Sequence, residues 1–192
     1  MVLLKEKKID DLIFMRLRED TIATKNIFEG RLLKLKVDTV KLPNKKTHKR
    51  EVVEHPGSVA IVPQFEDGKI LLVRQFRQPA KAVTVEIPAG TLDLGEKPDD
   101  CALRELIEET GYVARNLEKL FSCYTAPGYS SEKIHIYHAS QLEKTVQRLE
   151  TDEFIHLLII DLLKAIDMIR KGEIEDAKTI CGIFGVLHKT ML

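Results

Sequence analysis

The sequence predicts an α+β (mixed α/β) fold that begins with a small N-terminal antiparallel β unit. Two observations carry this prediction: the first half of the chain alternates apolar and polar residues between turn formers, and the C-terminal part changes to helical periodicity. With 192 residues, the chain is long enough for one sizeable core and a small appended unit. Turn formers around Pro56 and Gly57 indicate a boundary. We therefore expect the β unit in residues 1–54 and the main domain in residues 55–192.

The first strands are expected in pairs. Residues 31–53 alternate apolar and polar side chains and break at Pro43–Lys46, which predicts a hairpin. Two apolar runs, Ser58–Phe65 and Lys69–Phe76, are separated by a short acidic turn with a glycine and predict a second hairpin. Val83–Ile87 predicts one more short strand.

Two further strands are expected later in the chain, at Leu117–Tyr124 and Lys133–His138. The segment between them, residues 125–132, is rich in turn formers and small polar side chains. Segments of this composition often carry functional residues, so we expect a functional loop here.

The C-terminal part predicts two helices. Asp161 can cap a helix over Leu162–Lys171, and Asp176 can open a last helix that continues through His188. We interpret the polar residues Asp176, Lys178 and Thr179 as the cap and first turn of this helix, and therefore as structural.

Composition excludes some partners. Lysine and arginine number 30, and aspartate and glutamate also number 30, so no global field attracts nucleic acid or an anionic membrane. We see neither a signal peptide nor a membrane span, because charged residues interrupt every apolar run. A compact small-molecule ligand is the expected partner.

The cysteines and histidines predict no disulfide framework and no zinc site. Cys101, Cys123 and Cys181 are odd in number and far apart, which is typical of small buried side chains in a reducing cytoplasm. His135 and His138 lie three residues apart in an expected strand and therefore point to opposite faces.

The segment Gly90–Tyr112, GTLDLGEKPDDCALRELIEETGY, holds the densest charge pattern of the chain. Pro98 suits the first turn of a helix, where a missing N–H does no harm, and the two aspartates after it suit the positive end of the helix dipole. Gly111 suits the end of the helix. The segment therefore predicts a loop, a helix and a stop.

Within this helix, Glu105, Glu108 and Glu109 share one face, because they stand three and four residues apart. Like charges at this spacing repel by about 0.2–0.5 kcal/mol per pair, and a hard divalent cation would convert that repulsion into affinity. Arg104 can pair with Glu108 one turn on and hold it in place. Taken alone, the same residues also fit a solvated acidic surface helix.

The full pattern, G-x5-E-x7-R-E-L-x-E-E-x-G, resembles the Nudix box of the Nudix hydrolases. The one departure is Tyr112, at a packing position where the box usually has an aliphatic residue. Further segments, among them VRQFRQP, VEIPAGTL, YTAPGYSSE and DAKTI, resemble those of bacterial ADP-ribose pyrophosphatases within this family. Pro127, about fifteen residues past the box, is at the position usually taken to distinguish this subfamily.

The resemblance implies a Nudix fold, in which a mixed sheet is sandwiched between helices. It implies hydrolysis of the pyrophosphate bond of ADP-ribose to AMP and ribose 5-phosphate. It also implies a homodimer whose N-terminal β units contribute to the partner's active site. Hard oxygen ligands predict Mg²⁺ as the metal, with Mn²⁺ as a substitute.

The resemblance also assigns roles to individual residues. The metal ligands fall on the Ala89 carbonyl, Glu105 and Glu109, with Glu108 close to them. The expected catalytic residues are the base Glu132, together with Glu108 and its partner Arg104. The expected substrate-binding residues are Arg77, which contacts phosphate, Glu86, in the strand lining the nucleotide pocket, Phe28, which stacks on adenine, and Arg50.

Two alternatives stay open. One is a Nudix pyrophosphatase for another nucleoside diphosphate derivative, such as a nucleotide sugar or a dinucleotide, because the box fixes the diphosphate chemistry and leaves the group beyond it open. The other is a non-catalytic nucleotide-sensing module that kept the fold.

Overall fold

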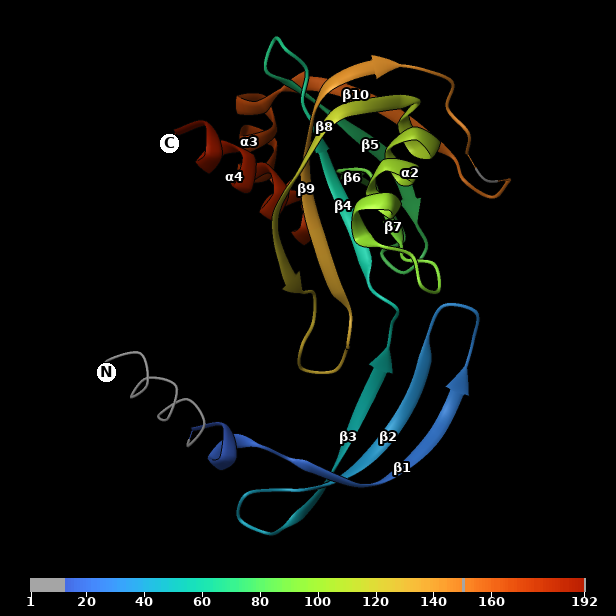
Figure 1. Ribbon diagram of the computed structural model, residues 1–192, viewed down its shortest axis with the longest axis vertical. Helices are drawn as coiled ribbons and strands as arrows, with labels where there is room; N and C mark the ends of the chain where they lie inside the picture. The colour runs from blue at the N-terminus through green and yellow to red at the C-terminus, as the bar shows by residue number, and fades with distance from the viewer. Residues whose placement is uncertain (1–12, 150, 192) are drawn as a thin grey trace. The chain divides into compact units, whose positions relative to one another are not determined.

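The computed structural model describes residues 13–149 and 151–191 (Figure 1). The chain divides into two compact units. One comprises Met1–His55 with Ala126–Ser131, and the other comprises Pro56–Thr125 with Glu132–Leu192. The loop Ala126–Ser131 therefore belongs with the N-terminal segment and not with the strands that precede and follow it in the sequence.

The N-terminal unit is an antiparallel sheet in the order β1-β2-β3. The hairpin formed by β2 (Lys34–Lys41) and β3 (Thr47–Glu54) matches the prediction, whereas β1 (Asp20–Glu29) was not expected. Every residue of β1 is exposed, so burial imposes no apolar alternation on its sequence.

The loop Ala126–Ser131 adds to the free side of β3 within this unit. The amide of Val53 donates to the carbonyl of Tyr129 at 2.8 Å, and the amide of Ser131 donates to the carbonyl of Val53 at 2.9 Å. The amide of His55 donates to the hydroxyl of Ser131 at 3.0 Å. Through these bonds, the loop pairs with β3 in the manner of a neighbouring strand.

The larger unit contains a mixed sheet in the order β7-β4-β9-β8. In this sheet β4 (Ser58–Pro63) runs parallel to β9 (Lys133–Lys144) and antiparallel to β7 (Ala89–Thr91), and β8 (Tyr112–Tyr124) runs antiparallel to β9. β8 begins earlier and β9 ends later than predicted. The short β7 lies where only a loop was expected.

A second sheet of this unit has the order β10-β5-β6. The strands β5 (Lys69–Arg77) and β6 (Ala82–Glu86) match the predictions closely. The strand β10 (Ile155–Asp161) was not predicted; it pairs antiparallel with β5 along its whole length.

Three helices complete the larger unit, and their bounds follow the sequence signals. α2 (Pro98–Thr110) has proline in its first turn and ends at Gly111, which adopts the left-handed conformation with φ 69°. α3 (Leu162–Arg170) follows Asp161, and α4 (Ala177–Met191) follows Asp176. None of the helices in the described ranges is long and apolar enough to cross a membrane.

The alternating side chains of β4 explain the layers of the core. Val59 and Ile61 pack toward α2, whereas Ala60 and Val62 pack toward α3 and α4. Helices therefore cover both faces of the mixed sheet, as the predicted fold requires (Figure 1). The second sheet joins the core on the α3 and α4 side through residues such as Leu72.

All three cysteines are free, but they are not all buried. Cys101, on α2, is buried in the core, Cys123 is half-buried, and Cys181 is exposed, so the expectation of three buried side chains is wrong for Cys181.

Candidate active site

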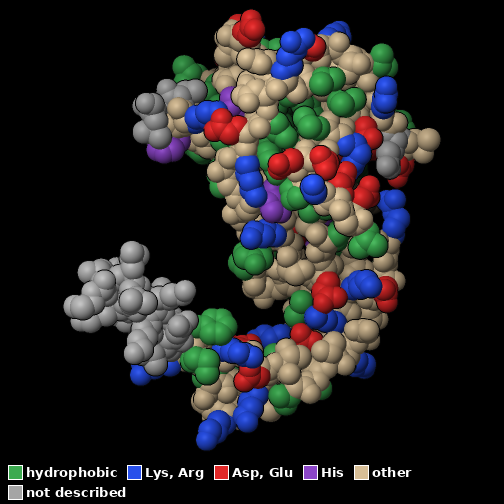
Figure 2. All heavy atoms as spheres, in the orientation of Figure 1, with side chains coloured by type: hydrophobic (Ala, Val, Ile, Leu, Met, Phe, Trp, Pro, Cys, Tyr) green, Lys and Arg blue, Asp and Glu red, His purple; other side chains and the backbone are tan. Residues whose placement is uncertain are grey.

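Arg104, on α2, donates hydrogen bonds to three carboxylates. Its Nε donates to Glu96 at 2.8 Å, and its Nη1 donates to Glu105 at 2.7 Å and to Glu108 at 3.0 Å. The expected pairing of Arg104 with Glu108 is therefore present. The hydrogen bond from Arg104 holds the pKa of Glu96 at about 2. Figure 2 shows acidic side chains, with basic ones among them, gathered on the face over α2.

Glu109 is the most buried carboxylate of the helix, with 3% of the residue exposed. Its Oε2 accepts a hydrogen bond of 2.9 Å from the amide of Ala89 in β7. Burial raises the pKa of Glu109 to about 8, although this hydrogen bond opposes the shift, and the charge of Glu105 adds to it. Burial also raises the pKa of Glu105. A cation beside these groups would relieve both costs.

The carboxyl group of Glu105 lies directly on the backbone of Gly90. A Cβ atom at Gly90 would come within 1.9 Å of the carboxyl carbon and of Oε1 of Glu105. Only glycine permits this approach, so the glycine that opens the motif and the glutamate of the helix form one contact.

The residues around Glu105 and Glu109 suit a divalent metal ion. The donors are carboxylate and carbonyl oxygens, and the carboxylates of Glu105 and Glu109 are buried beside Ala89 and Gly90, so the set suits a hard cation. Across the described ranges, no three acidic, histidine or cysteine side chains converge as a preformed metal cluster. Arg104 donates to Glu105 and Glu108, while Glu109 accepts from the amide of Ala89.

A cavity of about 370 Å³ adjoins this group in the larger unit. Its lining includes residues from β4, β5, β7, the start of α4 and both ends of the 126–131 loop: Ser58, Arg77, Ala89, Gly90, Thr91, Thr125, Glu132, Ile134, Asp176, Ala177 and Lys178. The backbone of Ala89 and Gly90 is thus shared by the cavity and the carboxylate contacts.

Two hydroxyl groups hold the carboxylate of Glu132. Ser58 Oγ donates to Oε1 at 2.7 Å, and Thr125 Oγ1 donates to Oε2 at 2.7 Å. The Thr125 amide also donates to the Glu132 carbonyl at 3.3 Å. These bonds fix the orientation of Glu132 at the edge of the cavity.

Arg77 and Lys178 share a buried acceptor, Glu86. Arg77 donates from Nε and Nη2 to the two oxygens of Glu86 at 2.8 and 2.7 Å, and Lys178 donates to Oε2. Thr84 donates a further bond of 2.6 Å. Burial alone would raise the pKa of Glu86, but the bonds from Arg77 and the charge of Lys178 outweigh it and hold the pKa at about 2.

The family model described as NUDIX domain matches residues 54–181. The chain belongs to the NUDIX domain family.

Similarity to individual proteins extends beyond the NUDIX domain. The chain is 44% identical to an ADP-ribose pyrophosphatase of Bacillus subtilis (strain 168) over 169 residues, which cover 87% of this chain and 91% of the relative. It is 46% identical to a methanol dehydrogenase activator of Bacillus methanolicus over 167 residues, which cover 86% and 90%. A solved structure, "Crystal structure of ADP compounds hydrolase", matches 90% of this chain and 94% of its own with a TM-score of 0.80 at 23% identity. That likeness concerns the fold alone.

The NUDIX fold brings most of the predicted residues into two adjoining groups. One group, on α2, holds Arg104, Glu105, Glu108 and Glu109. In the other group, Arg77, Ala89 and Glu132 line one cavity. Glu86 lies beneath that cavity, with 3% of its side chain exposed, as the acceptor for Arg77.

The remaining two predicted residues lie in the N-terminal unit. Phe28, on β1, is 59% exposed. Arg50, on β3, donates to both carboxylate oxygens of Glu19, at 3.0 Å from Nε and 2.6 Å from Nη2. Within this unit, Phe28 is thus an exposed apolar side chain, and the side chain of Arg50 is ion-paired with Glu19.

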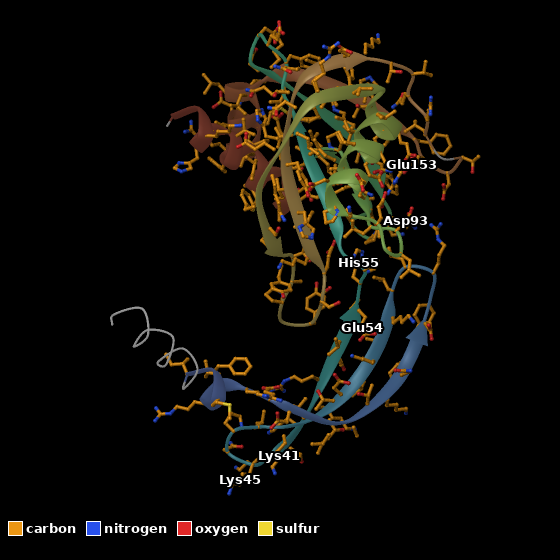
Figure 3. The ribbon with its side chains drawn as sticks, viewed as in Figure 1. Lys41, Lys45, Glu54, His55, Asp93 and Glu153 are labelled. Carbon is orange, nitrogen blue, oxygen red and sulfur yellow. The ribbon has the colours of Figure 1, made fainter. Side chains whose placement is uncertain are left out.

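Sequence reasoning missed two residues at this NUDIX site. The charge of Glu153, in the irregular segment before β10, contributes to the raised pKa values of both Glu105 and Glu109 (Figure 3). Lys178 was interpreted as part of a helix cap, yet its side chain lines the cavity. No motif marks Glu153. For Lys178 two signals were available: its position just after a capping aspartate, and its place in the segment DAKTI, which resembles the family.

Proposed function

We propose that this NUDIX hydrolase cleaves the pyrophosphate bond of ADP-ribose and releases AMP and ribose 5-phosphate. One water is consumed: its oxygen bonds to phosphorus, and the bond from that phosphorus to the bridging oxygen breaks. The observation that carries the proposal is the shared backbone of Ala89 and Gly90, which joins the buried carboxylates Glu105 and Glu109 to a cavity lined by two cationic side chains.

The similar proteins support this choice of substrate. The Bacillus subtilis relative is named for ADP-ribose, and it aligns with nearly the whole chain. The Bacillus methanolicus relative, with a similar identity, has a different name. Identity alone therefore leaves other substrates to be tested.

We assign the metal site to Glu105, Glu109, Glu108 and the carbonyl of Ala89, with Mg²⁺ as the ion and Mn²⁺ as its substitute. When bound, the ion neutralises phosphate charge and lowers the pKa of a bound water. The residues of the chain then have separate tasks. Arg104 holds Glu105 and Glu108 in place, and Gly90 leaves room for Glu105.

The cavity residues bind and orient the substrate. Arg77, fixed by Glu86, presents its guanidinium group to phosphate oxygens. Glu132, held by Ser58 and Thr125, is the candidate base that takes a proton from the attacking water. Glu153 is the second candidate for this role, because its charge acts on both Glu105 and Glu109.

One experiment tests the substrate. The purified protein is incubated with Mg²⁺ and, separately, ADP-ribose, nucleotide sugars, dinucleotides and nucleoside triphosphates, and the products are identified by chromatography and mass spectrometry. We expect the highest kcat/KM for ADP-ribose, with AMP and ribose 5-phosphate in equal amounts. A higher value for a nucleotide sugar or a dinucleotide would replace ADP-ribose, and preference for a triphosphate would overturn the assignment. Absence of any hydrolysis would favour a nucleotide-sensing module.

We also propose a homodimer in which the N-terminal units, through Phe28 and Arg50, reach the partner's substrate. The support is the large apolar exposure of this unit: Ile22, Ile27, Phe28, Leu32 and Leu33 are all exposed. Light scattering after size exclusion tests the assembly, and a fully active monomer would contradict it. The free cysteines support a cytoplasmic location.

A further inference from the structure

Lys178 lies in the first turn of α4, and its side chain is only 17% exposed. The nitrogen donates to Oε2 of Glu86 and to Oδ2 of Asp176, the latter at 3.0 Å. A lysine ammonium group has three N–H donors, and described residues accept two of them. The third donor remains available at a side chain that lines the 370 Å³ cavity.

Arg77, at the end of β5, also has an N–H donor that no described residue accepts. Its Nε and Nη2 are used by Glu86, and no described residue accepts from Nη1, while 39% of the side chain is exposed. Because Arg77 Nη2 and Lys178 Nζ share the Oε2 atom of Glu86, the two nitrogens lie within two hydrogen-bond lengths, about 6 Å at most. One phosphate group can accept from both.

Two carboxylates, Glu86 and Asp176, neighbour these cations. Glu86 is 3% exposed and lies behind the two cations. Asp176 accepts bonds from the amide and the hydroxyl of Thr179, at 3.0 and 2.5 Å, and so also serves the start of α4. Glu86 thus lies away from the cavity lining, whereas Asp176 lines the cavity with its Oδ2 already engaged by Lys178 and Thr179. Arg77 and Lys178 line the cavity with N–H donors that no described residue accepts.

We propose that Lys178 is a substrate-binding residue that contacts, together with Arg77, a phosphate group of the diphosphate substrate. Glu86 is the positioning residue that holds both cations at a fixed separation before substrate arrives. This inference rests on the proposed pyrophosphate hydrolysis, and it adds a second cation, from α4, to the phosphate site.

The test compares Lys178→Met, Lys178→Gln and Lys178→Arg with the matched control Lys189→Met. Lys189 is on the same helix and is also ion-paired, to Glu118, but lines no part of this cavity. For each protein, kcat and KM for ADP-ribose with Mg²⁺ are measured, together with inhibition by AMP and by ribose 5-phosphate and the thermal midpoint.

We expect Lys178→Met to lower kcat/KM by about 10- to 100-fold, the effect of losing one charge-assisted hydrogen bond. At least one product should inhibit about 10-fold more weakly by the same argument. Lys178→Arg should recover most of the wild-type kcat/KM and most of the product inhibition. Lys189→Met should keep both quantities within about twofold of the wild type. Lys178→Gln keeps a donor for Glu86 without the charge, and it decides the question if Lys178→Met does not fold.

Three results would overturn the inference. The first is wild-type kcat/KM in the folded neutral variants. The second is a lower kcat/KM with unchanged inhibition by both products, which would make Lys178 structural. The third is a loss that Lys178→Arg does not restore. If the wild type itself does not hydrolyse a diphosphate substrate, the proposed function fails, and phosphate binding by Lys178 is then judged by whether Lys178→Met weakens AMP binding in titration calorimetry.

Discussion

The ionisation of individual carboxylates organises this site at the scale of residues. Glu109 is almost fully buried and has a raised pKa, whereas Glu96, in the loop before α2, has a depressed pKa because Arg104 donates to it. Arg104 thus donates to Glu96, Glu105 and Glu108, whereas Glu109 accepts from the uncharged amide of Ala89, which leaves the charge of Glu109 for a cation.

Replacing Glu109 by glutamine tests this division. We expect Glu109→Gln to lower kcat by several orders of magnitude, because a neutral amide binds a divalent cation more weakly than a carboxylate does. The thermal midpoint without metal should be equal or higher, since a charge that is costly to bury is removed. Stabilisation by Mg²⁺ in a melting assay should disappear.

The control for Glu109 is Glu66→Gln, at an exposed turn position in the same unit. It should change neither kcat nor the effect of Mg²⁺ on melting. Near-normal turnover of Glu109→Gln at saturating Mg²⁺ would remove Glu109 from the ligand set.

The identity of the base is a second question at this scale. We expect Glu132→Gln to lower kcat about 100-fold or more with Mg²⁺ affinity unchanged, because a general base typically contributes about 10²–10⁴-fold. Glu153→Gln is the comparison, measured by steady-state kinetics and Mg²⁺ titration. If Glu153→Gln alone gives this signature, the role belongs to Glu153, and Glu132 becomes a residue that binds substrate.

At the scale of elements, β7 and α2 meet through a contact that only glycine permits. Gly90→Ala should displace Glu105, because the added Cβ would lie 1.9 Å from its carboxyl group. We expect a cost of about 1–3 kcal/mol in the free energy of unfolding, as for other overpacked sites, and a large loss of Mg²⁺ affinity.

Gly128→Ala is the stability control for Gly90, because nothing lies within 4 Å of a Cβ at that position. Denaturant unfolding and Mg²⁺ titration report both quantities. Unchanged Mg²⁺ affinity in Gly90→Ala would show that Glu105 can move without loss to the metal site.

The polar network of β5, β6 and α4 predicts a pH dependence. The pKa of Glu86 in the folded protein, about 2, is below its ordinary value of 4.5. Its ionised form therefore stabilises the fold above pH 4.5, and this contribution is lost as the pH falls from about 4.5 toward about 2. The contribution at neutral pH is on the order of 3 kcal/mol.

We expect the difference in unfolding free energy between the wild type and Glu86→Gln to be largest near neutral pH and to shrink in acid. Denaturant unfolding at several pH values measures it. Glu118→Gln, which removes the acid of a more exposed pair with Lys189, should show a much weaker dependence. A difference for Glu86→Gln that is constant with pH would contradict the assignment.

The strands β4 and β5 and the helix α2 could be predicted because strong local signals mark them: apolar runs, a proline near the helix start and a glycine at its end. The apolar run that contains β10 has no alternation that distinguishes strand from helix, and only its pairing with β5 decides.

Only part of the site could likewise be predicted from the sequence. The residues of the α2 motif could be predicted because they are neighbours in sequence. Glu153 and Lys178 reach the site only through the fold, from an irregular segment and from the start of the last helix. No local pattern marks Glu153, and the position of Lys178 just after a capping aspartate fits an ordinary first helical turn equally well.

At the scale of the whole molecule, the loop between Thr125 and Glu132 is the feature with consequences for both units. Its inner residues belong with β3 of the N-terminal unit, and its two ends lie in the larger unit, where the carboxylate of Glu132 is held. The N-terminal sheet therefore contributes to the order of a loop that ends in a candidate catalytic residue.

Val53→Pro tests this contribution. It removes the amide that donates to Tyr129, on the side of β3 that faces the loop. We expect kcat to fall at least about 10-fold if Glu132 is the base, because small displacements of catalytic groups are costly. The control, Glu51→Pro, changes the same strand two residues earlier, where no bond to the loop is described.

Steady-state kinetics and hydrogen exchange of residues 126–131 report the outcome for both variants. Faster exchange in the loop of Val53→Pro alone is expected. Equal kcat values for Val53→Pro and Glu51→Pro would mean that the loop keeps its order without β3.

The path of the chain has a practical consequence for dissecting the protein. The backbone passes between the two units at three points, after His55, after Thr125 and after Ser131. A protease cut after His55 would leave the loop in the larger fragment, still hydrogen-bonded to β3 in the smaller one. The two fragments should therefore copurify, and neither is a self-contained module that could be transplanted by a single cut.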